Sequence, residues 1–238
     1  MKRQNPKSTS RVSERDRKIL DHVARYRLTI NQVLHRLFFP DNGQSAVAKV
    51  TGRLCSAKRL ARFKLRHPRV YFTLTATEAQ NRGLSISRAQ SLGPQALPTE
   101  YAVLAYATLG SVQHRRLAAS ELQQSCPWLP PETLDSPHCI DESGGHPVLE
   151  LIRVDLGGKP DHVARKCYAD IQTRRSARQF ESLVHQGRFR LVVVTGTQEK
   201  AAAIQAAIDQ HVWPDGLQVH LVVIPELLLL TASSNNGT

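Results

Sequence analysis

The basic residues of this chain are concentrated in its first third. Residues 1–90 contain 20 Lys and Arg against 5 Asp and Glu, a net charge of +15, whereas residues 91–238 contain 12 against 15, a net charge of −3. This division indicates two domains with different tasks, and a chain of 238 residues is long enough for two small cores. A local positive charge of this size favours a polyanionic partner, either nucleic acid or an anionic membrane surface.

A polar arm and a series of short helices are predicted for the basic part. Residues 1–12 carry hardly an apolar side chain, so we expect a disordered arm whose Lys2, Arg3 and Lys7 follow a DNA backbone. Beyond the arm, apolar residues recur at helical spacing and later alternate. The pattern predicts helices at 13–26, 29–38, 44–62 and 75–83, with a basic two-stranded wing around 66–69. Residues 13–84 are therefore expected to form a winged helix-turn-helix domain.

The third predicted helix, residues 44–62, has two unlike faces. Its apolar residues fall on one side, which would pack on the first two helices: Val47, Val50, Leu54, Ala57 and Ala61. Small polar and basic residues fall on the other side: Ser45, Lys49, Gly52, Arg53, Ser56 and Arg59. Such a face suits the major groove, because long cations reach base edges there and small residues allow close approach. The alternative is the solvated face of an ordinary helical domain.

These faces assign expected roles to nine residues. Base-edge contacts are expected from Ser45, Lys49, Arg53 and Ser56. Phosphate contacts are expected from Arg59, Arg62, Lys64, Arg66 and Arg69. On this assignment, replacing Arg53 relaxes sequence choice, whereas replacing Arg66 weakens binding to all DNA alike.

The second part of the chain changes to alternating strands and helices. Residues 85–99 are rich in Ser, Gly and Pro and are expected to be a linker. Residues 100–122 have a helical pattern that breaks at Gly110. Strands are then predicted at 147–156, 189–195 and 217–224, and helices at 160–171 and beyond and at 197–211. Residues 100–238 are thus expected to form an α/β domain with a mixed sheet, which makes the whole chain α+β.

Several segments resemble the replication-relaxation family of plasmid and mobile-element proteins. The resemblance rests on RDRKILDHVARYRLTINQVLHRLFF, AKVTGRLCSAKRLAR and VYFTLTATEAQNRGL in the basic part. In the second part it rests on LELIRVDLGGKPDHVARKCYADI and FRLVVVTGTQEKAAAI, where the acidic pair is spread to Glu150 and Asp155. The resemblance implies DNA binding in replication, conjugative transfer or transcription control of a mobile element. It implies no specific reaction.

The second part also looks remotely like the restriction-endonuclease core, in which one strand carries Asp and the next carries Glu-x-Lys. The catalytic candidates are Asp141, Glu150 and Asp155, with Lys166 in place of the missing Lys, because Ile152 stands two residues after Glu150. Carboxylates in this arrangement hold Mg²⁺. An Mg²⁺-dependent DNA endonuclease is therefore the alternative to a protein that only binds DNA.

Other chemistry has weaker signals. His138, Cys139, His146, His162 and Cys167 are ligand types that suit zinc, but their spacing matches no common site. We therefore expect neither a metal nor another cofactor outside the nuclease alternative. The leading expectation is a transcriptional regulator or replication and conjugation accessory factor that binds double-stranded DNA. Its C-terminal domain would form a homodimer or contact a partner protein.

The expected location is the cytoplasm, away from any membrane. The basic N-terminus is followed by no apolar run, so it does not have the pattern of a signal peptide. The longest apolar stretch, residues 217–230, is interrupted by His220, Pro225 and Glu226 and is too short to cross a bilayer.

Overall fold

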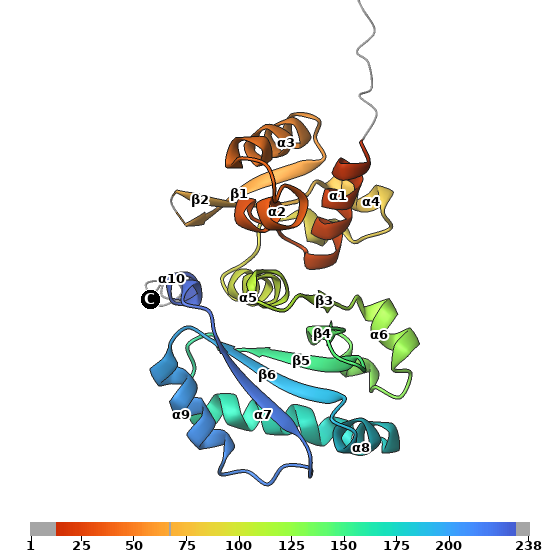
Figure 1. Cartoon of the computed structure of the whole chain (residues 1–238), viewed down its shortest axis with the longest axis vertical. Coiled ribbons are helices and arrows are strands. Elements are labelled where there is room, and N and C mark those ends of the chain that lie inside the picture. The colour runs from red at the N-terminus through yellow and green to blue at the C-terminus, as the bar shows by residue number, and fades with distance from the viewer. Residues whose placement is uncertain (1–12, 67, 232–238) are drawn as a thin grey trace, which may run out of the picture.

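The computed structural model describes residues 13–66 and 68–231 as two stacked parts (Figure 1). A group of short helices with a β-hairpin lies above a sheet that carries helices on both faces. The expected basic arm, residues 1–12 with Lys2, Arg3 and Lys7, lies outside the described residues. The chain is therefore a mixture of helices and sheet, as the sequence predicts.

The N-terminal part consists of three helices, a hairpin and a fourth helix. Its elements are α1 (Glu14–Tyr26), α2 (Asn31–Phe38), α3 (Gln44–Ser56), β1 (Leu60–Arg66), β2 (Arg69–Leu74) and α4 (Ala76–Asn81). Helix α1 starts at a capping box in which Ser13 and Asp16 each bond the other's backbone N–H. Strands β1 and β2 pair antiparallel from Leu60 opposite Leu74 to Arg66 opposite Arg69. These elements follow the predicted order, and the hairpin lies where the wing is expected.

Helix α3 ends at Ser56 rather than at Arg62, which corrects the predicted span. The backbone N–H of Lys58 donates to the carbonyl of Cys55, and that of Arg59 to the carbonyl of Leu54, each at 2.9 Å. Lys58 adopts a left-handed φ of 54°. Together these features form a Schellman motif, which ends a helix and is usually built on glycine. Because Lys fills the glycine position here, the sequence gives no stop signal, and the predicted helix ran on into β1.

The C-terminal part is built on a five-stranded mixed sheet. In chain order its strands are β3 (His114–Arg116), β4 (His138–Asp141), β5 (Val148–Val154), β6 (Phe189–Thr195) and β7 (Gln218–Val223), which is also their order in the sheet. Strands β3, β4 and β5 pair antiparallel, and β5, β6 and β7 pair parallel. The mixed sheet is confirmed, although the sequence predicted neither β3 nor β4.

Helices cover both faces of this sheet (Figure 1). The helices of this part are η1 (Ile86–Ala89), α5 (Ala96–Leu109), α6 (Ala119–Ser125), η2 (Pro131–Thr133), α7 (Pro160–Arg175), α8 (Arg178–His185), α9 (Gln198–Ile208) and α10 (Glu226–Thr231). Helices α7, α8 and α9 lie on one face, and α5 and α10 lie on the other, towards the N-terminal part. The single helical segment predicted for 100–122 is thus two helices with β3 between them.

A continuous apolar core joins the two parts of the chain. It runs from Tyr26, Leu28 and Val33 through helix α5 to Val192 and Val194 of the sheet. The expected linker, residues 85–99, contains η1 and the first turn of α5. The backbone N–H of its Leu92 donates to the Tyr71 hydroxyl at 2.9 Å. This segment is therefore packed against the hairpin.

Among the helices described, none combines the length and the apolar character needed to span a bilayer.

Replacing Lys58 tests the Schellman end of α3. We expect Lys58→Gly to raise the free energy of unfolding by about 0.5–1 kcal/mol, because glycine adopts a left-handed φ without a side-chain penalty. Denaturant unfolding of the variant and the parent measures the difference. Lys58→Ala is the matched control, since it removes the same charge and keeps the penalty. An equal gain in both variants would mean that relief of charge repulsion is the cause.

Candidate nucleic-acid interface and carboxylate cluster

The exposed face of α3 contains the small and basic residues that the sequence placed there. Ser45, Lys49, Gly52, Arg53 and Ser56 are exposed. Val47 and Leu54 are buried on the opposite side, where they pack against α1, α2 and the hairpin. A third buried residue, Thr51, was not predicted, and its hydroxyl donates to the Val47 carbonyl at 2.9 Å. Helix α3 therefore presents a face with short side chains and two cations to solvent.

Arg53 is bound to the start of α1. Its guanidinium donates to both carboxylate oxygens of Asp16, at 2.6 and 2.8 Å. The Asp16 side chain is 2% exposed, whereas that of Arg53 is 49% exposed. The hydrogen bond from Arg53 is the main cause that lowers the pKa of Asp16, with the Ser13 cap adding to it and burial opposing it. The residue expected to contact a base therefore joins α3 to α1.

Three other expected DNA contacts also have partners inside the protein. Arg59 donates to Glu78 at 2.5 Å. At the tip of the hairpin, Arg66 donates to the Leu229 carbonyl at 2.8 Å, and Arg69 lies 3.9 Å from Glu226. The last two contacts attach the hairpin tip to helix α10 of the C-terminal part.

Lys49, Arg62 and Lys64 are the expected contacts whose charge is available. All three are exposed, and none makes a hydrogen bond or ion pair within residues 13–66 and 68–231. Arg62 and Lys64 alternate along β1 and so share one face of the hairpin. A hollow of about 600 Å³ between α3 and the hairpin is lined by Ser45 and Arg62 among others. We define the basic face as Ser45, Lys49, Gly52, Ser56, Arg62 and Lys64.

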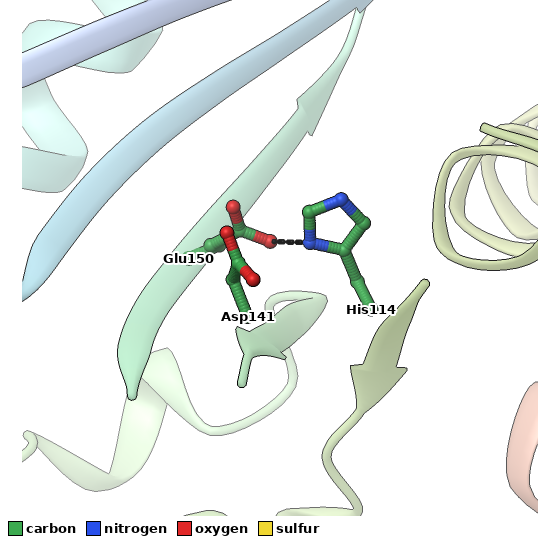
Figure 2. A group of neighbouring side chains, drawn as sticks. All are labelled: His114, Asp141 and Glu150. Atoms are coloured by element: carbon green, nitrogen blue, oxygen red, sulfur yellow. Dashed lines mark ion pairs between the residues drawn. The ribbon is translucent and has the colours of Figure 1, made fainter. Parts of the chain in front are cut away.

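A second candidate site lies on the face of the sheet that α5 covers. His114 of β3, Asp141 of β4 and Glu150 of β5 converge there (Figure 2). One ligand atom from each of the three lies within 4.8 Å of the other two. We call these three residues the carboxylate cluster. They come from three adjacent strands, so sheet pairing sets their spacing.

Glu150 is the centre of this cluster and is fully buried. Its Oε1 accepts hydrogen bonds from the Tyr106 hydroxyl at 2.8 Å and from Arg190 at 2.9 Å. Its Oε2 lies 3.0 Å from Nδ1 of His114. The ring of His114 stacks on Tyr106 with 4.4 Å between the centroids. Two donors and a ring therefore fix the position of both His114 and Glu150.

Glu150 affects the pKa values of neighbouring side chains. Burial raises the pKa of the Cys139 thiol to about 12, and the nearby Glu150 carboxylate adds to the effect. The pKa of the Tyr106 hydroxyl is raised for the same two reasons. For Asp141 burial opposes ionisation, but hydrogen bonds from the Ser143 hydroxyl and backbone outweigh it and lower the pKa. The carboxylate cluster thus lies beside a thiol and a phenol whose ionisation is disfavoured.

A cavity of about 510 Å³ opens beside the cluster. Its lining includes His114, Asp141 and Arg190, with His220 from β7 and Gln32 from α2. Arg190 also lies 3.5 Å from Asp141. The cavity therefore connects the carboxylate cluster to the underside of the N-terminal helices.

The other two catalytic candidates lie elsewhere. Asp155 follows the far end of β5, about 16 Å along the strand from Glu150. Its carboxylate accepts hydrogen bonds from Thr195 at 3.0 Å and from the Gly157 backbone at 2.9 Å. Lys166 is exposed on α7. The structure therefore joins Asp141 with Glu150 and leaves Asp155 and Lys166 outside, which corrects the grouping drawn from sequence.

Sequence reasoning missed His114, Tyr106 and Arg190. His114 lies in a three-residue strand with no periodic pattern, and it is far along the chain from Asp141 and Glu150. The one sequence feature near His114 that could have indicated a new element is the break of the helical pattern at Gly110. The residues weighed as zinc ligands, which include His138, His146 and His162, form no such group within the described part of the chain.

Comparison with protein-family models, with curated proteins and with solved structures finds no match for this chain. The resemblance to the replication-relaxation family therefore stays a prediction.

A double-mutant cycle tests the Asp16–Arg53 pair. We expect Asp16→Ala and Arg53→Ala to couple by about 1 kcal/mol in the free energy of unfolding, a value discounted for the water around Arg53. Lys49→Ala, from the same face of α3, is the matched control and should leave stability within about 0.5 kcal/mol of the parent. A coupling energy of zero would refute the structural role of Arg53.

The same pair predicts an acid dependence. The folded-state pKa of Asp16 lies below its ordinary value of 3.8. The unfolded chain therefore takes up the proton first as pH falls. The contribution of the pair is fully present above that ordinary value and is lost as pH falls through the lowered pKa of the folded state. Repeating the cycle between pH 7 and pH 2 measures it, and a coupling energy that stays constant over this range would contradict the assignment.

Proposed function

We propose that this chain binds double-stranded DNA through the basic face, with α3 in the major groove and the hairpin along the phosphates. The observation that carries the proposal is the set of free cations on adjacent elements. Lys49 lies on α3, and Arg62 and Lys64 lie on β1, which packs beside α3. Unpaired cations on a helix and a neighbouring hairpin suit base edges and phosphates respectively.

The surface around these cations favours nucleic acid over a membrane. A helix that lies on a membrane places large apolar side chains next to its cations. The exposed large apolar residues of the described chain are Ile86, Val112, Leu156, Val212, Leu228 and Leu229. None of them lies on α3 or the hairpin. A polyanion with no apolar phase is therefore the better partner for the basic face.

Ion pairs and hydrogen bonds within the protein change which residues we expect to contact bases and which we expect to contact phosphates. Lys49 takes the principal base contact, since Arg53 is engaged by Asp16. Arg62 and Lys64 take the phosphate contacts, and Arg66 and Arg69 keep the hairpin tip on α10. Replacement of Arg53 should then weaken specific and random DNA alike, through the position of α3.

The biological role follows from the resemblance to the replication-relaxation family. We propose a cytoplasmic transcriptional regulator or an accessory factor in replication or conjugation of a mobile element. A homodimer through the C-terminal part is the expected assembly. Strand β7 is an edge of the sheet, and such an edge offers backbone groups for pairing with a second copy.

An Mg²⁺-dependent nuclease is the second candidate. It is favoured by one observation, the convergence of Asp141 and Glu150 from neighbouring strands. Against it, Ile152 is buried where the core would carry Lys. We therefore rank DNA binding without cleavage first. Incubation of supercoiled plasmid with the protein and Mg²⁺ or Mn²⁺ separates the two. Nicking that Asp141→Asn abolishes would reverse the ranking.

Gly52 provides the sharpest test of the basic face. A Cβ atom at this position would meet no atom within 4 Å, so Gly52→Gln should raise the free energy of unfolding by up to about 1 kcal/mol. If α3 lies in a groove, the same change blocks close approach and lowers DNA affinity at least tenfold. Sites selected from a random duplex library provide the ligand, and fluorescence anisotropy measures the affinity. If the stabilised variant binds DNA with unchanged affinity, α3 does not lie in the DNA interface.

The cations are tested on specific and random duplexes together. Lys49→Ala should cost about 1–3 kcal/mol on the selected site and much less on random DNA. Lys64→Ala should weaken both alike and reduce the slope of log affinity against log salt by about 1. Lys166→Ala, an exposed cation on the far side of the sheet, is the matched control. Equal losses from Lys64→Ala and Lys166→Ala would show that only net charge matters.

A further inference from the structure

The two oxygens of the Glu150 carboxylate have different surroundings. Oε1 accepts hydrogen bonds from Tyr106 and Arg190. Oε2 is buried and has no hydrogen-bond partner, although the side chain is 0% exposed. A buried carboxylate oxygen without a donor is costly. Two donors therefore hold one oxygen in place, while the other receives no hydrogen bond from the described residues.

His114 shows the same feature from the opposite side. Its Nδ1 is also buried without a hydrogen-bond partner. It lies 3.0 Å from Glu150 Oε2, but the ring nitrogen and the oxygen are not aligned for a hydrogen bond. Two ligand atoms bound to one ion at about 2.0–2.2 Å each lie about 3.0 Å apart when they subtend a right angle at the ion, and about 3.4 Å apart at the tetrahedral angle. Figure 2 shows these two atoms facing each other, with the Asp141 carboxylate beside them.

Asp141 repeats the pattern of one fixed and one available oxygen. Its Oδ1 accepts hydrogen bonds from the Ser143 backbone at 2.9 Å and from the Ser143 hydroxyl at 2.6 Å. Its Oδ2 accepts no hydrogen bond from the described residues, and it lies 3.5 Å from a nitrogen of Arg190. Hydrogen bonds that hold the outer oxygen of a carboxylate while the inner oxygen ligates are a regular feature of metal sites.

We propose that His114 Nδ1, Asp141 Oδ2 and Glu150 Oε2 bind one divalent first-row transition-metal ion, with Zn²⁺ as the probe. The imidazole nitrogen favours such an ion over Mg²⁺, which prefers an all-oxygen shell. Two carboxylates face one guanidinium at this place, so a further positive charge balances the site. The proposal goes beyond DNA binding and does not depend on it, because no residue of the basic face takes part.

The site would fasten the junction between the two parts of the chain. It joins β3, β4 and β5, and the carbonyl of His114 accepts a hydrogen bond from the Tyr26 hydroxyl at the end of α1. In the same strand, Arg116 pairs with Glu100 of α5. An ion that fixes β3 therefore also fixes the contacts of α1 and α5, and its binding raises the thermal midpoint of the whole chain.

The experiment is a Zn²⁺ titration of the full chain after treatment with a chelator. Cys55 is the one incompletely buried cysteine among the described residues, so Cys55→Ser is the working background. We expect one Zn²⁺ per chain by calorimetry, with a thermal midpoint that rises with Zn²⁺ concentration. Asp141→Asn and His114→Phe should each lower the affinity at least tenfold. The phenyl ring of the second variant keeps the stacking on Tyr106.

His162→Ala is the matched control, because His162 is exposed on α7 and away from the cluster. It should leave the affinity unchanged. The proposal is overturned if no saturable binding occurs. It is also overturned if both variants bind Zn²⁺ like the parent.

A measurement on the unsubstituted chain guards against variants that fail to fold. Co²⁺ in the proposed site should show visible d–d absorption without a thiolate charge-transfer band. A thiolate band would place the ion on a cysteine and refute the site. Failure of the Zn²⁺ experiments leaves DNA affinity untouched, so the two proposals fail separately.

Discussion

Helix α5 is buried on both sides, and the rest of the structure depends on that packing. Ala102, Val103 and Leu104 point in successive directions around the helix, and each is fully buried. One side packs on the sheet and the other on α1, α2 and the hairpin. A helix that is apolar all round is stable only between two layers. The N-terminal part is therefore packed in a fixed position above the sheet, and α5 lies in the core that both parts share.

Charged contacts at the edge of this core fix the orientation of the two parts. Arg25 of α1 forms two hydrogen bonds with Glu121 of α6, at 2.5 and 3.0 Å. On the other side, Arg66 and Arg69 hold the hairpin tip against α10. Exposed ion pairs add little stability, but pairs at opposite edges restrict rotation about the apolar core. The basic face is thus held at a defined angle to the sheet.

The sequence predicted those elements whose pattern is local. Helix α1 has a capping box and a buried stripe, and β6 is a run of buried valines between turn residues. Strands β3 and β4 have three and four residues, and they are extended because they pair with β5. Helix α3 was predicted too long because Lys58 takes a position usual for glycine. Pairing and backbone conformation of this kind leave no periodic signal in one sequence.

The same distinction holds for the site residues. Asp141 and Glu150 could be named from sequence, since carboxylates on consecutive segments already suggest metal chemistry. His114 could not, because its strand was not recognised. Asp155 was grouped with Glu150 as one acidic pair, although five residues along a strand separate them by about 16 Å. Residue type thus identifies candidates, while sheet register decides which of them meet.

The loop that leads to His114 also holds the N-terminal part in place. Arg36 of α2 donates to the carbonyl of Leu109 at 2.6 Å and to that of Gly110 at 2.5 Å, at the end of α5. Helix α2 packs directly against α3, and Gln32 of α2 lines the cavity beside the carboxylate cluster. A change in the conformation of residues 110–114 would therefore also affect the hydrogen bonds that hold α2. Because α2 packs against α3, the position of α3 depends on the same short loop that positions His114.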